Sequence, residues 1–156
     1  MYAFNDFSLT HYLDSLAAEY EQKGYSVDYR PFTYNANFLP IAATETAQTV
    51  VTIDHDSDFL LGYQTLAAFD AQTSTVIQYP NLLARIIVET QQRQLQNERT
   101  HVVNLFGTAE RPWTYYKPAL FSAKSSFTVE LQNLTATPID ARFSFHGAKV
   151  ILRPKR

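Results

Sequence analysis

The hydrophobic and polar positions divide the chain into one helical segment and a long region that alternates with a period of two. Between Leu9 and Lys23 apolar side chains recur every three or four residues, which predicts an amphipathic helix. Ser8 is the expected N-cap, and Gly24 stands where a left-handed residue commonly ends a helix. A helix of about 15 residues is marginal alone. We therefore expect it to dock on its own sheet or on a neighbouring subunit.

After Gly24 the apolar residues alternate with polar ones, which is typical of β-strands. Strands are predicted at 29–34, 47–53, 59–69, 82–90, 127–132 and 139–152. Pro31 and Pro40 favour an edge position for the first of them. In the segment 59–69, the odd-numbered residues from Phe59 to Ala67 are expected to share one face. The polar run 91–99 is predicted to be an exposed hairpin end, although its composition also permits a helix.

The last strand changes phase at a glycine. Its apolar set runs from Ile139 to Phe145 on odd-numbered residues and then moves to Ala148, Val150 and Leu152. An extra residue in one strand produces such a change while keeping the apolar face inward. The pattern therefore predicts a β-bulge at His146-Gly147.

Seven or eight strands follow the one helix, and no second helical stretch is present to build parallel βαβ units. This order predicts a mainly β protein, an antiparallel two-sheet sandwich with the jelly roll as its leading topology. We expect one folded domain in which residues 1–30 form a helical arm and residues 31–156 form the β-sandwich.

Composition narrows the function classes. Of 156 residues, 13 are Lys or Arg and 15 are Asp or Glu, and none is cysteine. Disulfides and thiolate metal sites are excluded, and the dispersed basic residues argue against a nucleic-acid partner. The basic end, residues 153–156, is expected to be a solvated tail or a contact to an acidic partner. The chain shows neither a signal peptide nor an apolar run of about 20 residues, so we expect cytoplasmic synthesis and no membrane partner.

Catalytic and cofactor motifs are not recognisable, and the chain is expected not to be an enzyme and to bind no cofactor. The alternating carboxylates Asp54, Asp56 and Asp58 could supply calcium ligands, but they also suit a strand-connecting turn, and no metal site is predicted. The four histidines have no metal-ligand spacing. Asn133-Leu134-Thr135 matches a glycosylation acceptor and is expected to be a turn. Paired carboxylates for glycoside hydrolysis stay open, because their spacing in a sandwich does not follow from sequence.

Aromatic residues are the candidate partner-binding groups, because tyrosine and tryptophan are enriched at protein interfaces. The chain has ten tyrosines, six of them in the first 34 residues. The predicted contact residues are Tyr2, Phe4, Tyr12, Leu16, Tyr20, Tyr25, Tyr29, Trp113, Tyr115 and Tyr116. The last three form either an exposed binding strip or a plug of the core beneath a long loop.

The order of these signatures resembles a group of small tailed-bacteriophage virion proteins that decorate or cement the head. The resemblance rests on spaced segments between residues 31 and 152: Pro31-Phe32-Thr33-Tyr34, Thr49 to Asp54, Asp58 to Leu61, Leu105-Phe106-Gly107, Pro118 to Phe121, Phe127 to Asn133 and Phe143 to Gly147. It implies a jelly roll on the capsid surface, made in the bacterial cytoplasm, with the major capsid protein and a second or third copy of itself as partners. The Tyr-rich segment 1–34 would be the docking arm.

Two other interpretations remain open. The chain could be a head–tail connector, tail or fibre component of similar fold. It could also be a carbohydrate-binding sandwich that stacks sugars on Trp113, Tyr115 and Tyr116.

Overall fold

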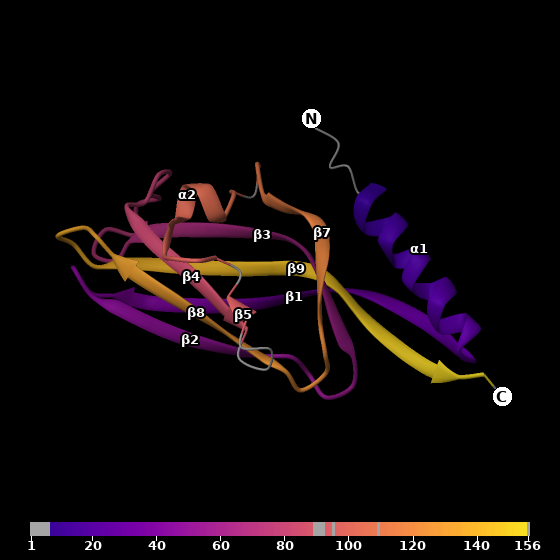
Figure 1. The fold of residues 1–156 in the computed structure, drawn as a ribbon. Coiled ribbons are helices and arrows are strands. Elements are labelled where there is room, and N and C mark those ends of the chain that lie inside the picture. Colours follow the sequence, from indigo (N-terminus) through magenta and orange to yellow (C-terminus); the bar gives the residue numbers. More distant parts are fainter. Residues whose placement is uncertain (1–6, 89–92, 95, 109, 156) are drawn as a thin grey trace.

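The computed structural model describes residues 7–88, 93–94, 96–108 and 110–155. A helix precedes the strands, and a short second helix interrupts them (Figure 1). The elements are α1 (Phe7–Gln22), β1 (Tyr25–Ile41), β2 (Thr46–Thr52), β3 (Asp58–Asp70), β4 (Leu82–Val88), β5 (Arg93–Gln94), β6 (Thr100–His101), α2 (Val102–Leu105), β7 (Trp113–Phe121), β8 (Ser126–Asn133) and β9 (Ile139–Pro154).

The strands form two antiparallel sheets. Sheet A has the order β1-β9-β3-β7, and sheet B has the order β2-β8-β4-β5, with β6 also paired to β4. The chain crosses from one sheet to the other after β1, β2, β3, β6, β7 and β8. This interleaving is the topology of a jelly roll. The predicted mainly β sandwich is confirmed, and so is the edge position of the first strand, β1.

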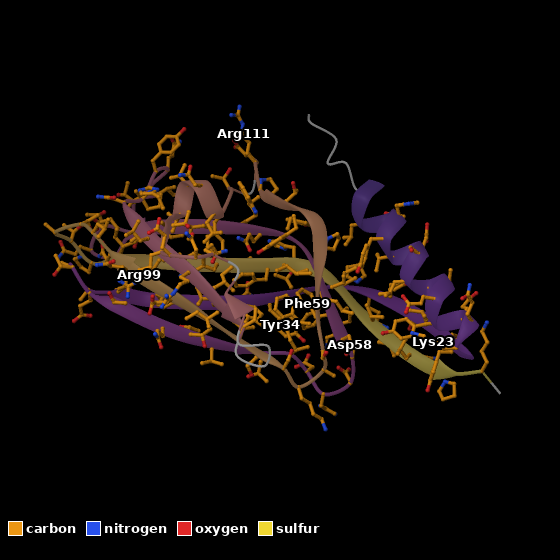
Figure 2. The ribbon with its side chains drawn as sticks, viewed as in Figure 1. Lys23, Tyr34, Asp58, Phe59, Arg99 and Arg111 are labelled. Carbon is orange, nitrogen blue, oxygen red and sulfur yellow. The ribbon has the colours of Figure 1, made fainter. Side chains whose placement is uncertain are left out.

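Phenylalanine rings fill the space between the sheets. Phe59, Phe127, Phe143 and Phe145 have no exposed surface. The rings of Phe127 and Phe145, from opposite sheets, meet edge to face with centroids 4.9 Å apart. At the end nearer to α1, Tyr34 packs edge-on against Phe59 at 4.8 Å (Figure 2). Such offset pairs add specific attraction to the burial of apolar area.

Helix α1 packs against the outer face of sheet A, beside the ends of β1 and β9 (Figure 1). Leu16 forms a second apolar cluster with Leu60 and Val150. The Tyr29 hydroxyl donates a hydrogen bond to the Leu13 carbonyl at 2.5 Å. The predicted stripe is confirmed, and the helix docks on its own sheet.

The two expected ends of the helix have different outcomes. Gly24 has φ 85°, so the predicted left-handed terminal residue is confirmed. The predicted cap at Ser8 is wrong, because α1 already includes Phe7. Strand β1 starts at Tyr25, so it runs across the 30/31 boundary that was expected between arm and sandwich.

The predicted bulge in β9 is wrong. Strand β9 pairs with β1 residue by residue through His146 and Gly147. The extra residue is on β3, where Leu61 pairs with Gly147 and Tyr63 with His146, which leaves Gly62 between them.

The phase change in β9 has another cause. Phe143 and Phe145 face sheet B, whereas Val150 belongs to the cluster beneath α1 on the opposite face. The apolar residues change phase because α1 covers the opposite face of β9 from there on. The strand itself stays regular. The bulge at Gly62 also makes the expected single face of β3 wrong. Phe59 and Leu61 face the core, but Gln64 and Ala68 do so beyond the bulge.

The segment 91–99 lies only partly within the described residues. β5 lies within it and β6 directly follows it, and the side chain of Gln96 accepts a hydrogen bond from the Ile86 N–H at 2.9 Å. Helix α2, which directly follows β6, was not predicted. Among the described residues, no helix is long and apolar enough to cross a membrane.

Candidate interaction surface

Helix α2 lies against β4 and β6, at the end of the sandwich opposite α1 (Figure 1). The ring of His101 accepts a hydrogen bond from the Val103 N–H at 3.4 Å and thereby caps the helix. Val102 and Leu105 point into the core, while Val103 and Asn104 are exposed. The four-residue helix therefore presents an apolar side chain to solvent.

The chain that leaves α2 is locked to sheet A. The Leu66 N–H donates to the Gly107 carbonyl at 2.8 Å, and the Thr108 N–H donates to the Arg111 carbonyl at 3.0 Å. A Cβ on Gly107 would overlap the Arg111 carbonyl oxygen, so only glycine allows this close approach. These contacts join the segment that follows α2 to β3 of sheet A.

An open hollow of about 720 Å³ lies on one side of α2, and β3 and the segment 76–80 also line it. Its rim carries Val76, Tyr79 and Val103, with 63 %, 77 % and 44 % of their surfaces exposed. Three large apolar side chains exposed around one hollow are typical of a contact surface.

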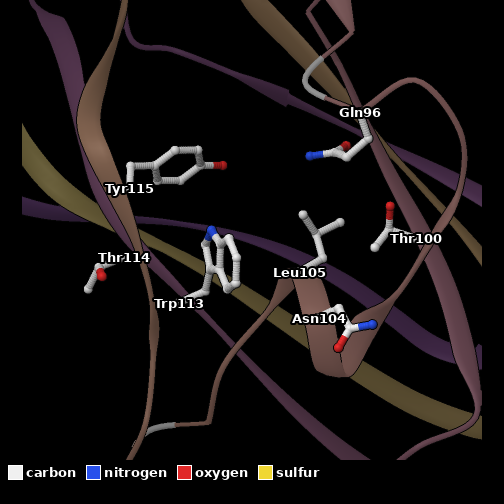
Figure 3. A pocket seen from close by; sticks show the side chains of 7 residues that line it. All are labelled: Gln96, Thr100, Asn104, Leu105, Trp113, Thr114 and Tyr115. Carbon is white, nitrogen blue, oxygen red and sulfur yellow. The ribbon is translucent and has the colours of Figure 1, made fainter.

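A smaller hollow of about 330 Å³ lies beside Leu105 of α2 (Figure 3). Trp113 at the start of β7 points into it and is 43 % exposed. Gln96, Thr100 and Asn104 provide polar groups around the rim. We call Val76, Tyr79, Val103 and Trp113, with the two hollows, the α2 surface.

Tyr115 points inward from the same strand. Its hydroxyl donates to Gln64 Oε1 at 2.9 Å, and Gln64 Nε2 donates to the Leu105 carbonyl at 2.6 Å. Gln64 is fully buried, so this chain of bonds satisfies an amide in the core and ties β7 to α2. Burial raises the pKa of Tyr115 above its ordinary value of 10.0.

The structure separates the predicted aromatic contact residues into groups. Trp113 is exposed, as expected for a binding strip, whereas Tyr115 is committed to the interior, as expected for a plug of the core. The side chain of Tyr116, and Tyr2 and Phe4, lie outside the described part of the chain.

The predicted contact residues of the helical arm pack within the molecule. Tyr12, Leu16, Tyr20 and Tyr29 belong to the cluster between α1 and sheet A, and Tyr25 is 38 % exposed at the start of β1. They remain predicted contact residues. As the structure stands, four of them already stabilise the fold.

The acidic loop 54–58 is held by a lysine. Lys149 Nζ contacts Asp54 Oδ2 at 2.6 Å and Asp56 Oδ1 at 3.4 Å, and lies 4.3 Å from the Phe32 ring centroid. Asp58 accepts a hydrogen bond from the Ala123 N–H at 2.8 Å. Hydrogen bonding to Lys149 lowers the pKa of Asp54. The ammonium group of Lys149 thus occupies the place that a cation bound by Asp54 and Asp56 would take. The carboxylate of Asp58 instead accepts a backbone hydrogen bond.

Sequence reasoning missed an ion-pair network on the outer face of sheet B. Glu130 of β8 is 4 % exposed and accepts hydrogen bonds from Arg99 Nε at 2.7 Å and Gln48 Nε2 at 2.9 Å, while Arg85 lies 3.2 Å away. The bond from Arg99, followed by that from Gln48 and the charge of Arg85, lowers the Glu130 pKa. In the sequence, Glu130 lies between the apolar residues Val129 and Leu131, on the polar face of the strand. Only the register with β2 and β4 brings its partners together.

His146 also gains partners from other strands. Its ring lies 3.0 Å from the hydroxyls of both Thr33 and Thr65 and stacks on Tyr63 with centroids 4.6 Å apart. Burial lowers the pKa of His146, which favours a neutral ring held by two hydroxyls. In the part of the chain that the structure covers, no three His, Asp or Glu side chains converge as metal ligands.

Asn133 fills a structural role in its turn. Its amide donates to the carbonyls of Ala42 and Thr137 at 3.1 and 2.8 Å, and its Oδ1 accepts from the Thr135 N–H at 2.9 Å. Asn133 ends β8 and the chain turns before β9 begins at Ile139, so the predicted turn is confirmed. Asn133 is fully buried, and its amide is committed to the fold.

Comparisons with known proteins add little. No family model matches the chain, and no curated protein matches it. Among solved structures, the VP2 subviral particle of infectious bursal disease virus matches with a TM-score of 0.29 and 13 % identity over 81 % of this chain. Structures of the Gx and Gt strains of that virus match with TM-scores of 0.26 and 0.25 and identities of 14 % and 12 %, over 81 % and 83 % of this chain. The matches span 40 %, 40 % and 42 % of those chains, and similarity this weak does not carry a function over.

Proposed function

We propose that this chain is a structural virion protein that decorates the head of a tailed bacteriophage and binds the major capsid protein through the α2 surface. The observation that carries the proposal is the exposed apolar set Val76, Tyr79, Val103 and Trp113 around the two hollows beside α2. A long-lived contact to a protein shell needs such a surface and needs no catalytic group.

Three further features support this role. The jelly roll agrees with the fold that the resemblance to head-decoration proteins implies. The interior is closed by phenylalanine rings from both sheets. The carboxylates of Glu130, Asp54 and Asp56 and the ring of His146 are paired with side chains of the protein itself. A protein bound at many equivalent shell positions gains strength by repetition, which suits a moderate contact area per copy.

The test is co-sedimentation of the purified protein with expanded heads that lack it. The wild-type chain should sediment with the heads and saturate at a fixed ratio to the major capsid subunit. Tyr79→Ser and Trp113→Ser should each weaken binding by at least about tenfold, because exposed aromatic anchors dominate such contacts.

Val50→Thr is the matched control, because Val50 is an exposed apolar residue on β2, away from α2. It should bind like the wild type. Equal binding by all four proteins would refute the α2 surface. Binding lost in Tyr25→Ser alone would assign the contact to the arm side of the molecule.

A carbohydrate-binding role is the second candidate, because Trp113 lies in a hollow with the amides of Gln96 and Asn104 around it. A sugar could stack on the indole and accept bonds from these amides. Trp113 is the single tryptophan, so titration with glycans can be followed by its fluorescence. A saturable change would favour this role over head decoration, and an unchanged spectrum would remove it.

A connector, tail or fibre component would have the same kind of surface. The copy number distinguishes it from a head protein. A head-decoration protein is present in proportion to the major capsid subunit, whereas a connector or tail protein is present at the few positions of its ring.

A further inference from the structure

Strand β2 forms an unprotected edge of sheet B. It spans Thr46–Thr52, pairs with β8 without a break in register, and contains neither a charged residue nor proline. An exposed, regular and uncharged edge readily pairs with another strand.

The other sheet edges in the described residues carry features that hinder such pairing. Edge strand β1 contains Pro31 and Pro40, which cannot donate backbone hydrogen bonds. Edge strand β7 loses register with β3 between Thr114 and Ala119. In β4, the Ile86 N–H already donates a hydrogen bond to the side chain of Gln96. β2 therefore stands out as the edge that could accept a further strand.

The free backbone groups of β2 can be assigned from its pairing with β8. The Asn133 N–H donates to the Glu45 carbonyl at 2.8 Å, and the Ile53 N–H donates to the Ser125 carbonyl at 2.9 Å. Because antiparallel pairs alternate, odd-numbered residues face β8, and the even-numbered ones present N–H and C=O at the free edge. These are Thr46, Gln48, Val50 and Thr52, all with exposed side chains.

We infer that β2 pairs antiparallel with β2 of a second copy of this chain, about a two-fold axis at Thr49. In this register Thr46 faces Thr52 of the second copy, and Gln48 faces Val50 of the second copy. Each residue whose N–H and C=O point to the free edge then pairs with such a residue of the second copy. This pairing yields about eight backbone hydrogen bonds. Sheet B would continue from one copy into the other.

The strand is complementary to itself, which is why the second copy is the occupant we favour. Threonine pairs with threonine across the axis, and no like charges meet within the strand. At each end Glu45 lies beside Ile53 of the second copy. The Lys124 N–H donates to the Ile53 carbonyl at 3.2 Å, so the backbone of Lys124 lies beside Ile53. Asp54 at the same end is already bonded to Lys149.

The geometry also sets the stoichiometry and the strength. A two-fold contact uses the same strand on both copies, so it closes at a dimer. A seven-residue strand is about 24 Å long, and pairing of one strand per copy buries an area at the low end of specific interfaces. We expect a dissociation constant in the micromolar range.

Sedimentation velocity over a concentration series tests the edge. The wild type should pass from monomer to dimer. Val50→Pro removes an outward N–H but no bond to β8, and it should raise Kd by at least about tenfold. Val50→Thr keeps the N–H and should dimerise like the wild type. Val50→Lys, which keeps the N–H but charges the edge, should weaken the dimer even if the proline variant misfolds. A wild type that stays monomeric, or a Val50→Lys variant that dimerises fully, overturns the inference.

Disulfide cross-linking tests the register, because the natural chain has no cysteine. Thr49→Cys places two thiols across the proposed axis, where non-hydrogen-bonded Cα atoms lie about 4.5 Å apart. Thr52→Cys is the control: its two copies would lie about 20 Å apart, although residue 52 is the more exposed. Oxidation should link Thr49→Cys and leave Thr52→Cys monomeric. The reverse order, or no link in either, refutes the two-fold at Thr49.

This inference does not depend on the proposed function. A protein that stays monomeric in solution would refute the β2 contact without bearing on the α2 surface or its binding to heads. Failure of head binding would leave the β2 contact measurable in solution.

Discussion

Replacement of Leu16 by alanine tests whether α1 belongs to its own subunit. Leu16 is 9 % exposed and packs against Leu60 and Val150, which are almost completely buried. It is the most buried of the described α1 side chains. The substitution leaves the helix backbone and its polar face unchanged, so the effect reports the packing between helix and sheet.

The expected magnitude follows from the buried area. Leucine to alanine removes three carbon groups, and each contributes about 0.8 kcal/mol when buried. The transfer contribution is thus about 2.4 kcal/mol, and a cavity would add to it. Because α1 lies on the surface and can move toward the sheet, we expect the cavity to close partly. The free energy of unfolding should fall by about 2–3 kcal/mol.

Urea unfolding, followed by circular dichroism, measures the change. Gln22→Ala is the control, because Gln22 is exposed on the same helix, and it should shift the free energy of unfolding by less than about 0.5 kcal/mol. A Leu16→Ala protein as stable as the wild type would contradict the packing described here. The helix would then be free to dock on a neighbouring subunit, as the sequence alone allowed.

Three further substitutions test the ion-pair network of Glu130, the close approach at Gly107 and the buried amide of Gln64. Because the pKa of Glu130 is lowered from 4.5 in the folded chain, its stabilising contribution is complete above that value and is lost as pH falls through the folded pKa. Glu130→Gln should therefore reduce stability near pH 7 by about 2 kcal/mol and flatten its acid dependence, measured by urea unfolding at several pH values. Equal acid dependence in both proteins would contradict this. Gly107→Ala should lower the melting temperature clearly, because its Cβ overlaps the Arg111 carbonyl, and an unchanged melting temperature would refute the close approach. Tyr115→Phe should cost about 1–2 kcal/mol in urea unfolding, since Gln64 Oε1 loses its donor, and no loss would mean that the bond is not needed.

The alternation of apolar residues was sufficient to predict the sandwich. Val51, Ile53, Phe127, Val129, and Phe143 all lie in the core, where period two placed them. The helix was equally clear, because Leu16 and its neighbours recur at helical spacing.

The errors arose where a face is covered by an element distant in sequence. The apolar phase of β9 moves at His146 because α1 covers its outer face, and local pattern alone reads such a move as a bulge. The true bulge at Gly62 was missed because Tyr63 and Thr65 continue an apparent alternation. Helix α2 is four residues long, which is too short to show a period.

The candidate surface was only partly predictable. Trp113 was singled out by composition, but Val76, Tyr79 and Val103 come from separate segments that the fold brings to one hollow beside α2. The partners of Glu130 likewise depend on strand register, which a single sequence does not determine.

Imaging of the native particle by electron cryomicroscopy tests the central claim most directly. A decoration protein predicts jelly-roll density on the outer face of the head, repeated with the capsid lattice, with Tyr79 and Trp113 against the major capsid protein. Density confined to the tail or to one vertex, or a particle that lacks this chain altogether, would contradict it.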